Sequence, residues 1–171
     1  YDHPANEFVA QFIGSPKMNL MPATLVSAGE AQSIVRLWNG KEQAVSVATP
    51  ASAEGGRVKL GIRPEHIEWA GADDAPYLAD VLFVEHMGNE TYHYLDSGTS
   101  GEPWVVRNPR RTCVAAGETE GYALRPEHCH LFDETGQAYA RRMAGNGEAR
   151  DPGMSAPPVS LVEPLRANAV H

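Results

Sequence analysis

The sequence spells GIRPEH at residues 61–66 and ALRPEH at residues 123–128, so Arg-Pro-Glu-His occurs twice, each time after an apolar stretch. A proline has no N–H to give to a β-ladder, and the residue before a proline is restricted to extended conformations. Each copy is therefore typical of the end of a β-strand. A strand-ending device used twice predicts two similar halves that fold against each other.

Around the two copies, apolar and polar residues alternate in short segments that are separated by turn residues. Asn39-Gly40 and Gly88-Asn89 are expected to form the tight turns of β-hairpins, because both residue types tolerate a positive φ. Short strands at this turn-separated spacing predict an all-β antiparallel barrel or sandwich. The expected strands are 19–28, 33–38, 43–48, 57–63, 77–87, 90–97, 103–107 and 120–125.

One short helix is expected before the strands, with Phe8, Val9, Phe12 and Ile13 on one side and with Gly14 and Pro16 ending it. A helix this short needs a partner to cover its apolar face. Either it packs on the strands that follow, or its partner lies upstream of this chain.

The composition excludes some classes of protein. The 22 acidic residues outnumber the 14 basic ones, for a net charge of -8, whereas a nucleic-acid surface needs clustered cations. The densest basic cluster, residues 107–111, is expected to be a solvated turn. No apolar run reaches the roughly 18 residues of a membrane span.

Two further expectations concern the cysteines and the end of the chain. Cys113 and Cys129 are expected to be free thiols. The Gly- and Pro-rich residues 141–171 are expected to form a flexible tail.

Three histidines offer one candidate metal site. His128 and His130 are expected on one face of an extended strand, and His66 from the first repeat would complete a three-nitrogen zinc site. Their spacing is not a recognised metal-ligand pattern, so we predict no metal. In the structural alternative the histidines are half-buried surface groups.

An acid–base site could use Glu65, Glu127, His86 and His93, with the two histidines facing each other across the Gly88 hairpin. Proximity alone makes no catalyst without a pocket and a shifted pKa. We therefore predict no catalytic residue, and expect the two glutamates to pair with the neighbouring arginines or to cap the turns.

Four stretches together resemble one family of domains. The resemblance is to the C-terminal regulatory part of the ATP-binding subunits of bacterial carbohydrate importers of the ABC class, of the maltose and glycerol-3-phosphate type, and it covers residues 1–143. The stretches are FVAQFIGSPKMNLMPA (8–23), LGIRPEHI (60–67), VEHMGNET (84–91) and RPEHCHLFDETGQA (125–138).

The resemblance implies an OB-like barrel, called a TOBE domain, in residues 17–140. Residues 1–16 would then hold the last helix of a nucleotide-binding domain that this chain lacks, against which Phe8 and Phe12 would pack. The resemblance further implies a homodimer, association of the parent subunit with membrane permease subunits at the cytoplasmic side of the inner membrane, and a cytoplasmic regulatory protein as a further partner.

The candidate interface residues follow from the same resemblance. The first are Gly88, Asn89 and Glu90 of the hairpin, where the resembling motif lies in the regulatory barrel. The others are the charged residues of the two repeats, namely Arg63, Glu65, Arg125 and Glu127.

Nucleotide chemistry is not expected in this chain. The sequence has no G-x-x-x-x-G-K-[ST] loop, whose amides and lysine would hold phosphates, and no LSGGQ-type signature. We predict no cofactor in the chain itself, with ATP and Mg²⁺ belonging to the parent subunit. The transported solute is not predicted.

A small-ligand sensor is the alternative function. Similar barrels in molybdate proteins bind oxyanions where two copies meet. Arg63 and Arg125 would serve as anion partners if both faced one cleft, and a sugar is the other ligand considered.

Overall fold

The computed structural model describes residues 3–70, 75–99, 101–108 and 114–141, and within these ranges the chain is mostly β-strand. The helices described are α1 (Glu7–Phe12) and the 3-10 helices η1 (Ala51–Ala53), η2 (Pro64–His66) and η3 (Pro126–His128). The strands described are β1 (Asn19–Ser27), β2 (Ser33–Leu37), β3 (Glu42–Val45), β4 (Arg57–Ile62), β5 (Ile67–Ala70), β6 (Tyr77–Met87), β7 (Glu90–Leu95), β8 (Trp104–Asn108), β9 (Thr119–Leu124) and β10 (His130–Phe132). The prediction of an all-β chain after one short helix is confirmed. The tail expected at 141–171 lies outside the described residues, apart from Arg141.

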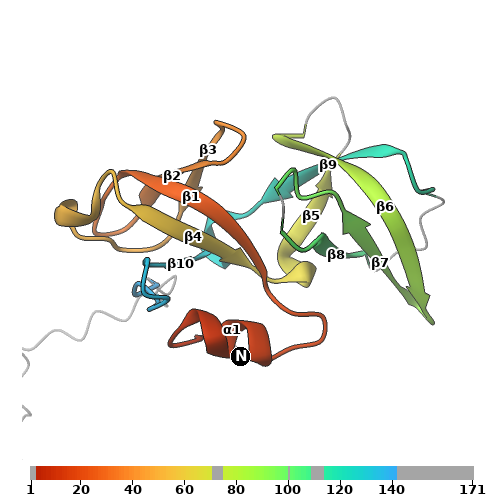
Figure 1. The fold of residues 1–171 in the computed structure, drawn as a ribbon, viewed down its shortest axis with the longest axis horizontal. Coiled ribbons are helices and arrows are strands. Elements are labelled where there is room, and N and C mark those ends of the chain that lie inside the picture. Colours follow the sequence, from red (N-terminus) through yellow and green to blue (C-terminus); the bar gives the residue numbers. More distant parts are fainter. Residues whose placement is uncertain (1–2, 71–74, 100, 109–113, 142–171) are drawn as a thin grey trace, which may run out of the picture.

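The described strands form two five-stranded antiparallel sheets that lie side by side in Figure 1. The first sheet has the order β10-β4-β1-β2-β3 and the second the order β5-β9-β6-β7-β8. Both expected hairpin turns are confirmed: Gly40 has φ 80° between β2 and β3, and Gly88 has φ 68° between β6 and β7.

Strand β5 was not expected from the sequence, and near β10 only an extended stretch at residues 128–130 was expected. The two strands are four and three residues long, and they follow 3-10 turns, β5 directly and β10 after Cys129, so neither offers enough alternation to be recognised. Their partners lie far away in the sequence, β9 for β5 and β4 for β10.

The two Arg-Pro-Glu-His copies are the crossings between the sheets. From β4 the chain runs through η2 into β5 of the second sheet, and from β9 it returns through η3 into β10 of the first sheet (Figure 1). Ile67 lies opposite Leu124 in the second sheet, and Gly61 lies opposite His130 in the first sheet. Gly61 comes six residues before Ile67, and His130 comes six residues after Leu124. The antiparallel register therefore passes unshifted through both turns. The interpretation that each copy ends a strand is confirmed.

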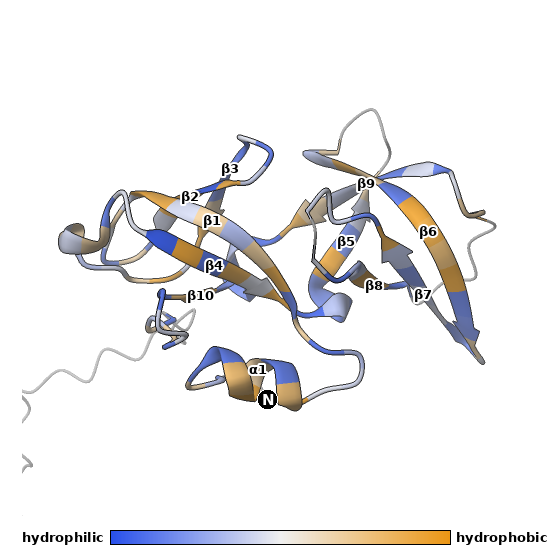
Figure 2. Ribbon diagram, in the orientation of Figure 1, coloured by the Kyte–Doolittle hydropathy of each residue, from blue (hydrophilic) through white to orange (hydrophobic). Residues whose placement is uncertain are grey.

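One apolar core continues from the first sheet into the second. Strand residues alternate between this core and solvent, as the hydrophobic and hydrophilic bands along β4 illustrate in Figure 2. Leu60 and Val35 fill the core of the first sheet, Val81 and Tyr122 that of the second, and all belong to the same buried cluster. The sheets are thus joined by packing as well as by the two crossings.

The helix packs on the first sheet through a residue that the apolar pattern did not single out. Ala10 is fully buried and shares a small cluster with Met18 and Phe132. Phe8 and Phe12 instead stack on each other with ring centroids 4.5 Å apart, and they are 66% and 74% exposed. Of the two expectations for the helix, packing on the following strands therefore accounts for Ala10 but leaves the aromatic side chains uncovered.

Gly61 of the first repeat is held by close packing. A Cβ at this position would lie 2.7 Å from Met18 Sδ and 2.8 Å from an atom of the buried Phe132 ring, both shorter than normal contact distances. The second repeat has Ala123 here, which is only half-buried. Gly61→Ala is therefore expected to destabilise the chain by about 1–3 kcal/mol through overpacking, measured as the loss of unfolding free energy in urea. Ala123→Gly is the matched control, and a Gly61→Ala variant as stable as the parent would contradict the close approach.

Candidate functional site

The two 3-10 turns meet through their histidines. His66 ends η2 and His128 ends η3, and their rings stack with centroids 4.0 Å apart and planes 12° from parallel. Because η2 leads out of the first sheet and η3 leads back to it, this stack joins the two crossings directly.

The arginines of the two repeats lie in different surroundings. Arg63 is 1% exposed, and its Nη1 donates to the carbonyl oxygen of Ile13 at 2.6 Å. Ile13 is the residue that caps α1, so its carbonyl belongs to the end of the helix. A buried cation of the first crossing thereby holds the helix in place.

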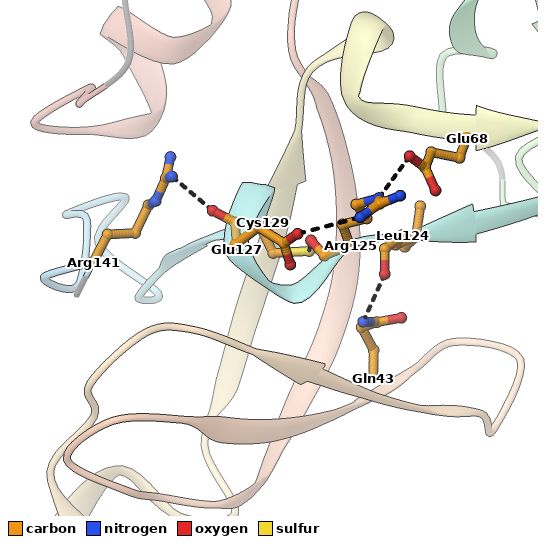
Figure 3. A network of polar contacts seen from close by, with 7 residues as sticks. All are labelled: Gln43, Glu68, Leu124, Arg125, Glu127, Cys129 and Arg141. Carbon is orange, nitrogen blue, oxygen red and sulfur yellow. Dashed lines mark hydrogen bonds and ion pairs between the residues drawn. The ribbon is translucent and has the colours of Figure 1, made fainter. Parts of the chain in front are cut away.

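Arg125 is exposed and makes a network at the second crossing, shown in Figure 3. Its Nε donates to Glu68 Oε1 at 2.6 Å, and its Nη1 lies 3.7 Å from Glu127 Oε1. The expected pairing of Arg125 with Glu127 is therefore present, with Glu68 as the closer partner. Arg63 and Arg125 are directed to different groups, so these contacts lend no support to the oxyanion alternative.

Two further side chains contact the second crossing from outside the repeat, one at the end of β9 and one at η3 (Figure 3). Gln43 of β3 donates from Nε2 to the carbonyl oxygen of Leu124 at 3.2 Å. Arg141 donates from Nη2 to the carbonyl oxygen of Glu127 at 2.6 Å. Arg141 was not predicted as a contact residue, because it lies where the strand pattern ends.

The expectation that His128 and His130 share one face of an extended strand is wrong. Pro126 starts a 3-10 turn that includes His128, and the strand begins only at His130. Burial and the nearby Arg141 charge lower the pKa of His130 to about 3, so the ring is neutral and accepts from Arg141 Nη1 at 3.0 Å. Among the residues that the structure describes, no cluster of three His, Cys, Asp or Glu side chains could hold a metal ion.

Cys129, between these two histidines, is a buried thiol. Burial raises its pKa to about 12, and its Sγ donates to the carbonyl oxygen of Arg125 at 3.3 Å. A thiol held protonated in this way is a poor nucleophile and metal ligand. Cys113 lies outside the described residues, as do three residues of the basic cluster at 107–111.

His86 and His93 do not face each other. His86 lies opposite Thr91, next to the turn of the hairpin, whereas His93 lies opposite Val84 and is fully buried. His93 Nδ1 is 2.9 Å from Oε2 of Glu120, a residue of β9 that the sequence analysis missed. Glu120 could have been noticed in the sequence as a carboxylate at a position of a predicted strand that faces the core.

Tyr122 completes this buried group. Its hydroxyl donates to Glu120 Oε2, the same oxygen that His93 contacts. Burial and this hydrogen bond raise the pKa of the Tyr122 phenol, which therefore stays protonated. The group cross-links β7 and β9 inside the second sheet.

The β6–β7 hairpin ends in the predicted contact residues. Gly88 and Asn89 are exposed, and Glu90 accepts from the Tyr92 hydroxyl at 3.1 Å and pairs with Arg107 at 3.4 Å. Met87, one residue before the turn, is 57% exposed. The tip is thus accessible to a partner, and a direct contact there stays a prediction.

Two family models match the chain, and they overlap at the first crossing. Residues 14–67 match the MalK OB fold domain and residues 60–132 match the TOBE domain. Among solved structures, a cytoplasmic molybdate-binding protein, ModG, has a TM-score of 0.55 at 12% identity, covering 66% of this chain and 94% of that one. At this identity the likeness shows the fold alone.

Curated relatives are ATP-binding proteins of sugar import. The alpha-glucoside transport ATP-binding protein AglK of Rhizobium meliloti is 38% identical over 139 residues, which are 81% of this chain and 38% of that protein. The maltose/maltodextrin import ATP-binding protein MalK of Vibrio vulnificus is 36% identical over 150 residues, which are 88% of this chain and 40% of that protein. The chain spans about two-fifths of the length of these relatives.

The fold and these matches define the class: an OB-like TOBE domain. More particularly, the chain belongs to the MalK type of these domains, which occurs in the ATP-binding subunits of ABC importers for sugars. The resemblance stated from the sequence is confirmed.

Proposed function

We propose that the chain is the regulatory and dimerisation domain of the ATP-binding subunit of an ABC importer for sugars or related solutes. The observation that carries the proposal is the helix α1. Its end is fixed by Arg63, while Phe8 and Phe12 form an exposed stacked pair. Such a pair fits the docking face for a preceding nucleotide-binding domain, since large exposed apolar side chains mark interaction sites.

The proposed mechanism is mechanical. A movement of the nucleotide-binding domain would reach Phe8 and Phe12, pass through the Ile13 carbonyl to Arg63, and so reach the crossing between the sheets. The second sheet, with Gly88, Asn89 and Glu90 at its hairpin tip, would then contact the other subunit or a cytoplasmic regulator. The charged residues of the crossings, Glu65 and Glu127 included, would adjust this movement.

The parent subunit would couple ATP hydrolysis to uptake, in association with permease subunits at the cytoplasmic side of the inner membrane. ATP and Mg²⁺ would bind in the parent's nucleotide-binding domain, with no cofactor in this chain. Within the described residues, the helices are too short and too polar to span a membrane. Sugars fit the names of the relatives, and the individual solute is left open.

Dimerisation is tested by the mass of the chain in solution. Light scattering over a concentration series is expected to give a dimer for the parent chain and also for the double variant Phe8→Ser, Phe12→Ser, because the proposal places self-association in the barrel. The double variant is preferred to removal of residues 1–16, which would also take away the Ile13 carbonyl that Arg63 holds. A dimer that dissociates in the double variant would mean that the phenylalanines only cover each other. A monomer in both cases would contradict dimerisation by this chain.

A further inference from the structure

The outer face of the first sheet carries a groove that the proposed function does not use. A cavity of about 620 Å³ lies over β4, β1 and β2, with Pro22 and Thr24 of the central strand β1 at its floor. Both residues point away from the core, because they alternate with the buried Met21, Ala23 and Leu25. The turn after β10 closes one side with Asp133 and Glu134.

Cations stand in register around this floor. Thr24 lies opposite Arg57 on one neighbouring strand and opposite Arg36 on the other, while Pro22 lies opposite Lys59. Partners in register point to the same face of a sheet. The groove therefore has guanidinium groups at both sides and an ammonium group at one end.

Each of these cations already has a carboxylate partner. Arg36 Nη2 is 2.9 Å from Glu42, Arg57 Nε is 2.8 Å from Glu134, and Lys59 Nζ is 2.7 Å from Glu7. An anionic ligand would have to displace these carboxylates or lie beside them. A neutral ligand rich in hydroxyl groups meets both donors and acceptors without breaking a pair, since a hydroxyl can donate and accept.

Trp38 supplies the apolar wall. It follows β2, lines the groove, and is fixed in place by an edge-to-face contact with Trp104, whose ring centroid lies 4.6 Å away. An indole held by a second indole keeps its orientation without a ligand. The indole offers a flat apolar surface, and the paired charged groups around it offer hydrogen-bond donors and acceptors. A sugar ring matches both, because its C–H face is apolar and its edge carries hydroxyl groups.

We infer that this groove binds a neutral saccharide, with Trp38 against a sugar face and with Arg36, Arg57 and the Glu134 carboxylate on the hydroxyl groups. The inference does not depend on dimerisation, so its failure and the failure of the proposed function are distinguishable. It places a sugar-responsive site on the first sheet, away from the exposed helix residues Phe8 and Phe12.

The test is a titration of the ¹⁵N-labelled 171-residue chain with maltotriose, and separately with trehalose, glycerol and inorganic phosphate, followed by amide chemical shifts. Saturable shifts with a saccharide are expected at residues 22–24, 36–38 and 57–59. Phosphate is expected to leave these amides unshifted. The mass of the chain is measured in the same samples, so that any change in self-association is seen separately.

Variants connect the shifts to the groove. Arg36→Ala and Arg57→Ala, whose side chains are 53% and 85% exposed, are expected to fold and to weaken saccharide binding about tenfold each, as loss of a charged hydrogen bond predicts. Trp38→Ala is expected to abolish binding. Because it also removes a packing contact, its fold is checked from its amide spectrum. Trp69→Ala, at an exposed tryptophan of the second sheet, is the matched control and should bind as the parent does.

Three results would overturn the inference. The first is no saturable shift in the groove with maltotriose or trehalose, and the second is a saccharide shift that Arg36→Ala and Arg57→Ala leave unchanged. The third is equal or stronger binding of phosphate at the same amides, which would assign the groove to an anion instead.

Discussion

Arg63→Ala is expected to destabilise the chain by about 3 kcal/mol, whereas the same change at the exposed Arg125 should leave the unfolding free energy nearly unchanged. Removing Arg63 leaves a cavity where a 1%-exposed side chain was, and it deprives the Ile13 carbonyl of its donor. Arg125 makes its ion pairs at the surface, where such pairs contribute little.

Urea unfolding of both variants measures the difference, and the matched positions of the two repeats make Arg125→Ala the control. At roughly 2–4 °C per kcal/mol for a chain of this size, the midpoint of thermal unfolding should fall by about 10 °C for Arg63→Ala. Hydrogen exchange at residues 7–13 should also rise, because the helix loses its attachment. Equal losses at the two positions would refute the assignment of Arg63 as the residue that fixes the helix.

The repeats show what the sequence could predict and why. A proline ends a ladder by covalent geometry, so Arg-Pro-Glu-His identified the ends of β4 and β9 without reference to the rest of the chain. The turns at Gly40 and Gly88 were predictable for the same reason, since a positive φ is a local property of glycine. The resemblance to the importer family was also predictable, because it depends on four motifs whose order and spacing are visible in the sequence.

Contacts between distant segments were not predictable. The same motif buries Arg63, which donates to the Ile13 carbonyl at the end of α1, and exposes Arg125, and no local pattern records this difference. Strand β10 forms because it pairs with the edge of β4, which lies far away in the sequence. His128 lies in a 3-10 turn, although the local sequence pattern predicts an extended strand there. Trp38 and Glu120 were missed because their partners, Trp104 and His93, lie far along the chain.

Glu120→Ala is expected to be as damaging as Arg63→Ala, with a loss of about 3 kcal/mol. Glu120 is 7% exposed, and one of its carboxylate oxygens accepts from both His93 and Tyr122. Truncation removes the charge that both buried partners face and leaves their polar atoms without this acceptor, which costs several kcal/mol in an apolar interior. Because the group joins β7 to β9 across the second sheet, the loss should appear as faster hydrogen exchange in both strands.

The matched control for Glu120→Ala is Glu85→Ala. Glu85 also accepts from a tyrosine hydroxyl, that of Tyr94 at 3.0 Å, but it does so on the exposed outer face of the hairpin. This change should cost well under 1 kcal/mol, because water replaces the lost acceptor. Glu120→Gln should be intermediate, since an amide oxygen still accepts while the negative charge is gone. If Glu120→Ala unfolded in urea at the same midpoint as Glu85→Ala, the buried group would not stabilise the second sheet. The link between β7 and β9 would then have to come from apolar packing alone.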